Sequence, residues 1–112
     1  MKPFSFRAPL FPARVRVFFS LEDYYKKYPE RANENTTNFE AFVADGGSGV
    51  ISLVLIKYSD ANLAHECVRA AWAVLNYACA YVEHDNDEPL AYMVGHIFDK
   101  VQKHYKKESA NV

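Results

Sequence analysis

The alternation of apolar and polar residues predicts a strand and a hairpin in the first half of the chain. Residues 14–19 alternate between arginine and valine and end in two phenylalanines, a pattern typical of a β-strand. Residues 39–44 and 50–58 form two more apolar runs, and the DGGSG linker between them supplies the glycines that a reversing chain needs. These segments predict a small sheet that contains a β-hairpin.

The N-terminal segment and the residues after the first strand have different signals. Residues 1–13 contain three prolines among aromatic residues, which favours an extended arm packed against the body of the protein. Ser20 with Asp23 three residues later is a capping arrangement, and it predicts a short helix that Pro29 ends.

Two longer helices are expected in the second half. Ser59 or Asp60 is placed to cap the first of them. Its apolar residues recur at helical spacing, with Trp72 and Cys79 widening the stripe: Ala64, Val68, Ala71, Leu75, Ala78 and Val82. Asp85 or Asp87 caps the second helix, which has Pro89 in its first turn.

This order of elements predicts an α+β fold, with a small mixed sheet (strand, short helix and β-hairpin) followed by two packed helices. The chain has 112 residues and is 50% hydrophobic, which is enough apolar material for one modest core. We expect an N-terminal arm at 1–13, a single domain at 14–105 and a flexible tail at 106–112.

Charge and hydropathy narrow the classes of partner. The formal net charge is −1, so no summed field attracts the protein to nucleic acid or to an anionic membrane. The chain has no signal-peptide pattern and no run of eighteen apolar residues, which predicts a cytoplasmic protein. Cys67 and Cys79 are twelve residues apart on one predicted helix, about 18 Å, so we expect buried thiols and no disulfide.

His65 and Glu66 are adjacent near the start of the first long helix. Zinc peptidases carry the motif H-E-x-x-H, in which two imidazoles one turn apart bind one ion and the glutamate acts on a metal-bound water. Here Arg69 occupies the position of the second imidazole, and a guanidinium does not bind zinc. The dipeptide is therefore either the remnant of a metal site or a chance pair near a helix terminus.

A second acidic residue, Glu88, begins the segment E-P-L-A-Y in the next predicted helix. With these features, residues 40–100 resemble the minimal zincin-like proteins of phages and prophages, in which a short loop joins the motif helix to an acidic residue and an Ala-Tyr pair. The resemblance implies a zincin-like core in which His65 and Glu88 are ancestral zinc ligands and Glu66 is the ancestral general base.

The missing ligand leaves two alternatives. Either His84, in the loop between the helices, or His96, two turns beyond Glu88, substitutes for it and zinc is bound. Otherwise Arg69 replaces the charge of the ion by pairing with Glu88, and no cofactor is present. We expect the second arrangement.

The resulting hypothesis is an accessory protein of a phage or prophage, present in the cytoplasm of the bacterial host cell. Its degenerate metallopeptidase-like site acts by binding an unidentified protein partner and not by hydrolysis. One alternative is a zinc-dependent peptidase with a substituted ligand. Another is a homo-oligomeric structural module, in which exposed aromatic residues and the N-terminal arm pack against a second copy.

Overall fold

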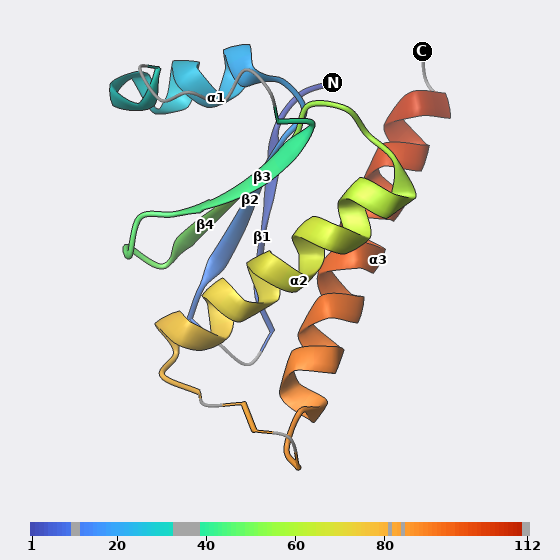
Figure 1. The fold of residues 1–112 in the computed structure, drawn as a ribbon. Helices are drawn as coiled ribbons and strands as arrows, with labels where there is room; N and C mark the ends of the chain where they lie inside the picture. Colours follow the sequence, from blue (N-terminus) through green and yellow to red (C-terminus); the bar gives the residue numbers. More distant parts are fainter. Residues whose placement is uncertain (10–11, 33–38, 81, 84, 111–112) are drawn as a thin grey trace.

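A computed structural model describes residues 1–9, 12–32, 39–80, 82–83 and 85–110, and its centre is a mixed sheet of four strands (Figure 1). In the order of the sheet the strands are β1 (Phe4–Arg7), β2 (Arg14–Phe18), β4 (Val50–Leu55) and β3 (Ala41–Asp45). Strands β2 and β4 are parallel, and the other two pairings are antiparallel. The predicted α+β class, the mixed sheet and the hairpin are confirmed.

The described residues form four helical segments beside the sheet: α1 (Leu21–Lys27), the 3-10 turn η1 (Pro29–Arg31), α2 (Asp60–Tyr77) and α3 (Glu88–Ala110). The hydroxyl of Ser20 accepts a hydrogen bond from the Asp23 amide, and that of Ser59 accepts one from the Asn62 amide. The predicted N-cap of α1 is therefore formed, and Ser59 is the one of the two candidates that caps α2, because each side chain satisfies an amide that has no partner inside the helix.

The two faces of the sheet are covered by different elements (Figure 1). Helices α2 and α3 pack on one face, where alternate residues of β2 and β4, such as Val17 and Leu53, are fully buried. On the other face, α1 contributes Tyr24 to a smaller cluster with Phe18 and Val54. The sheet is thus buried on both sides at its centre, as a parallel strand pair requires.

The N-terminal arm belongs to this sheet. Phe4 to Arg7 pair in register with the residues from Arg14 to Val17, so the extended segment is the edge strand β1. The aromatic ring of Phe4 stacks on His104 of α3, with ring centroids 3.7 Å apart. The arm therefore covers the body of the protein, as predicted, and it does so as a strand.

Helix α2 ends at Tyr77, five residues before Val82, the last residue of the apolar stripe that predicted this helix. The amide of Ala80 donates to the carbonyl of Leu75 and that of Cys79 to the carbonyl of Asn76, which is the hydrogen-bond pattern of a Schellman motif. Cys79 occupies the left-handed position of this motif, with φ of 57°. Its side chain is exposed, so the expectation that both thiols are buried holds only for Cys67.

The last helix is longer than expected. Helix α3 continues to Ala110, so most of the segment predicted as a tail is helical, and residues 111–112 lie outside the described part of the chain. Its C-terminal half is held by the ring of Tyr105, which stacks on Tyr58 with centroids 3.5 Å apart. Within the described residues, no helix is both long enough and apolar enough to cross a bilayer.

Candidate functional site on helix α2

Four side chains on the solvent-facing side of α2 define the surface that we call the α2 outer face: His65, Val68, Arg69 and Trp72. Residues four apart lie one above the other on a helix, so the two polar residues form one row and Val68 with Trp72 forms the next. All four side chains are exposed, and Val68 and Trp72 retain 42% and 39% of their accessible surface.

The exposure of Val68 and Trp72 was not predicted, because both were assigned to the buried stripe of the helix. The spacing of His65 and Arg69 in the H-E-x-x-R segment nevertheless indicated that Val68 and Trp72 are exposed. Residues 65 and 69 must face outward to bind a ligand, and positions 68 and 72 are their immediate neighbours on the helix surface.

Glu66 points to a different side of α2 and is buried, with 4% of its surface accessible. Asn62, one turn earlier on the same side, donates hydrogen bonds to the Glu40 carboxylate and the Lys57 carbonyl, which flank β3 and β4. Tyr77, further along this side, contacts Gly49 in the hairpin. These two contacts place the Glu66 side of the helix along the β3 edge of the sheet.

The Glu66 carboxylate is only half satisfied. Its Oε1 lies 2.9 Å from His65 Nδ1, while Oε2 is buried with no hydrogen-bond partner among the described residues. Whenever this carboxylate is ionised it can only accept hydrogen bonds, and Nδ1 of His65 is then the donor, which leaves Nε2 as the nitrogen available to a ligand. A carboxylate that orients an imidazole in this way is common at metal and catalytic sites.

The acidic residue assigned as the third ancestral ligand lies elsewhere. Glu88 is exposed at the start of α3, which runs antiparallel to α2 (Figure 1). Nε2 of Gln102 in α3 donates a hydrogen bond of 3.3 Å to Oδ1 of Asp60, the first residue of α2. These two residues therefore lie at the same level along the helix pair. At 1.5 Å per residue, Glu88 is then about 13 Å beyond the level of His65 along the helix pair. No ion pair joins Arg69 to Glu88 among the described residues.

Of the two candidate substitute ligands, only His96 is among the described residues, and its ring lies against β1. His84 lies outside the described residues. The ring of His96 is 6.0 Å from the ring of Phe6 in β1, and its Nε2 is buried without a partner within the described chain. Burial lowers the pKa of His96, Lys100 lowers it further, and Asp99 opposes the shift. His96 therefore belongs to the packing between α3 and β1.

The chemistry available at α2 follows from this arrangement. In the described part of the chain, no three side chains of His, Cys, Asp or Glu gather where they could hold a metal ion. Burial raises the pKa of the Cys67 thiol to about 12, with a smaller contribution from Glu66, so this thiol is not a nucleophile near neutral pH. What remains is an oriented imidazole, a guanidinium and two exposed apolar side chains. Comparisons with protein-family models, curated proteins and solved structures find no match to this chain.

Proposed function

We propose that this protein is a binding domain with a degenerate zincin-like core, an accessory protein of a phage or prophage, which contacts a protein partner through the α2 outer face. The observation that carries the proposal is Arg69, exposed beside His65 at the position where a zinc site needs its second imidazole. A guanidinium excludes a cation from this face and attracts carboxylates. The same side chain that removes metal chemistry therefore creates a recognition site for an acidic segment.

The neighbouring residues suit such a contact. Tryptophan and arginine are the residue types that contribute most to the energy of protein interfaces, and here Arg69 is three residues from Trp72. Trp72 and Val68 supply apolar area that a partner would bury, and His65 adds a hydrogen-bonding group held by Glu66. We expect the partner to present an apolar side chain flanked by a carboxylate.

One observation favours the alternative of a zinc-dependent peptidase. The unpaired Oε2 of buried Glu66 is what a general base would retain for a bound water. A homo-oligomeric module is the third candidate, since Trp72 and Tyr92 are both large exposed aromatic residues that a second copy would cover. Metal content and oligomeric state separate these candidates from a binding domain.

The metal experiment uses the native protein and an Arg69→His variant. Elemental analysis of the native protein should find well under one zinc per chain, because one exposed imidazole is a weak site. Arg69→His creates two imidazoles one turn apart, and zinc affinity by calorimetry should rise at least about tenfold. Stoichiometric zinc in the native protein would support the peptidase instead. An Arg69→His variant with no gain would show that this face is not a former metal site.

The binding experiment compares matched aromatic variants. Proteins cross-linked to the native chain in a bacterial lysate are quantified against those recovered with Trp72→Ala, Arg69→Glu and, as control, Tyr92→Ala. A specific partner should be lost with the first two variants and retained with the third, because Tyr92 is exposed on α3 and outside the α2 outer face. Equal recovery with all three would refute the assigned surface, and a self-association lost with Trp72→Ala would favour the oligomeric module.

A further inference from the structure

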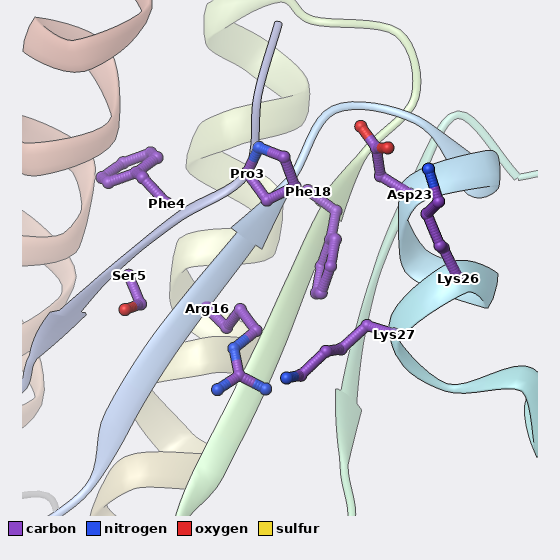
Figure 2. Close-up of a pocket in the computed structure, with 8 residues that line it drawn as sticks. All are labelled: Pro3, Phe4, Ser5, Arg16, Phe18, Asp23, Lys26 and Lys27. Atoms are coloured by element: carbon purple, nitrogen blue, oxygen red, sulfur yellow. The ribbon is translucent and has the colours of Figure 1, made fainter.

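An open hollow lies between β2 and α1, on the face of the sheet opposite α2 and α3 (Figure 2). Its volume is about 420 Å³, within the usual range of small-molecule sites. Apolar and charged side chains both line it, among them Pro3, Arg16, Phe18, Asp23, Lys26 and Lys27. We call it the β2–α1 hollow.

The charge of the β2–α1 hollow is opposite in sign to that of the chain. Three of its lining side chains are basic and Asp23 is acidic, a net charge of +2, whereas the whole protein has a formal net charge of −1. A basic recess on a weakly acidic protein concentrates positive potential at one place. Such a recess favours a small anion over a neutral or cationic ligand.

Two of the cations converge in the hollow. Figure 2 shows the ammonium group of Lys27 extended toward the guanidinium of Arg16, while the ammonium group of Lys26 points away from it. Neither Arg16 nor Lys27 forms an ion pair with a carboxylate among the described residues. Like charges repel, so this arrangement is favourable when an anion lies between them.

Arg16 is held in place by the sheet. It is in register with Ser5 of β1 and Ser52 of β4, and its Nη1 donates a hydrogen bond of 2.8 Å to the hydroxyl of Tyr28. One edge of the guanidinium is therefore fixed, and the remaining N–H groups are left to donate to a ligand in a planar fork. Lys27, exposed on α1, supplies the second positive charge.

We propose that the β2–α1 hollow binds a small phosphate monoester. A phosphate monoester carries a charge close to −2 at neutral pH, which suits the two cations that converge in the hollow, and its oxygens accept from the Arg16 guanidinium and the Lys27 ammonium group together. The exposed ring of Pro3 supplies the apolar contact for the organic part of the ligand, and the buried Phe18 lies beneath the hollow. This site is separate from the α2 outer face, and the inference does not depend on the function proposed above.

The test uses phenyl phosphate as the probe at about 0.15 M salt, where weak surface charge effects are screened. Phosphorus NMR or calorimetry should find saturable binding with Kd below about 1 mM. Arg16→Gln and Lys27→Gln should each weaken it at least about tenfold, since each removes a charge-assisted hydrogen bond. Lys107→Gln removes the same charge from α3, outside the hollow, and should leave Kd unchanged.

Three results would overturn the proposal. Equal affinity for benzoate would mean that the site takes any aromatic anion, and equal affinity for inorganic phosphate would mean that the organic part makes no contact. Unchanged binding in Lys27→Gln would place the ligand elsewhere. Because Lys27 is exposed, this variant should fold normally and remains informative even if Arg16→Gln does not fold.

Discussion

At the scale of single residues, Glu66 is the side chain whose chemistry most clearly lowers the stability of the fold. Its side chain is buried beside the edge of the sheet, yet only one carboxylate oxygen has a hydrogen-bond partner in the described chain. A buried acceptor that loses water without gaining a partner costs folding free energy. Such costs persist mainly where a residue serves another purpose, so the burial of Glu66 supports the ancestral site that we propose.

We therefore expect that replacing Glu66 with an apolar residue of similar length stabilises the protein. Glu66→Met should raise the free energy of unfolding by about 1 to 3 kcal/mol, because it removes an unsatisfied buried carboxylate and keeps the volume. Urea unfolding followed by circular dichroism measures the change. His65→Ala is the control for the hydrogen bond alone, and it should not stabilise. A loss of stability in Glu66→Met would mean that Oε2 has a partner in solution, such as a bound water.

At the scale of secondary-structure elements, the last turn of α2 is fixed by its contact with the hairpin. Gly49 has φ of +89°, and a Cβ atom there would lie 2.7 Å from the ring of Tyr77. Gly47 has a similar φ of +78° but open space around it. The two glycines thus separate the cost of backbone conformation from the cost of packing against α2.

Gly49→Ala should consequently destabilise the protein by about 2 to 4 kcal/mol, through backbone strain and the clash with Tyr77 together. Gly47→Ala should cost only about 1 to 2 kcal/mol, through strain alone. Denaturant unfolding of both variants tests the difference. Adding Tyr77→Ala to Gly49→Ala should recover part of the loss, and equal costs for the two glycine variants would show that the Tyr77 ring moves aside freely.

At the scale of the whole molecule, two groups in the contact between the sheet and the two long helices link stability to alkaline pH. Burial is the main cause that raises the pKa of Cys67 from 9.0 to about 12 and the pKa of Tyr58 from 10.0 to about 12. Each folded-state value is higher than the unfolded one, so the unfolded chain loses these protons first. The contribution of the two protonated groups to the free energy of unfolding is fully present below pH 9 and is lost between about pH 9 and 12.

Unfolding free energies measured at pH 8, 9 and 10 should therefore decline, and the decline should begin near pH 9. In Cys67→Ala the overall stability is lower, but the slope between pH 9 and 10 should be smaller, since the titrating thiol is gone. Cys79→Ala, which removes an exposed thiol, should keep the slope of the parent. An unchanged slope in Cys67→Ala would mean that the thiol is not shielded from water in the folded state.

The sequence by itself determined the elements whose signals are local. The cap at Ser20, the cap at Ser59 or Asp60 and the reversal between β3 and β4 depend on hydrogen bonds or backbone angles within a few residues. All three are formed, and Ser59 is the residue that makes the second cap. The α+β class followed from the order of those elements. The place of His65 and Arg69 on one face of α2 also followed, because helical spacing alone decides which residues share a face.

The tertiary structure decided what depends on distant contacts. Strand β2 pairs with β1 on one side and, in parallel, with β4 on the other. No local sequence pattern specifies the partner or the register of these pairings. The exposure of Trp72, the burial of Glu66 and the distance of Glu88 from His65 depend on how α2 lies against the sheet and α3. Apolar periodicity identifies the faces of a helix but does not say which of them a neighbour covers, since burial is a property of the assembled layers.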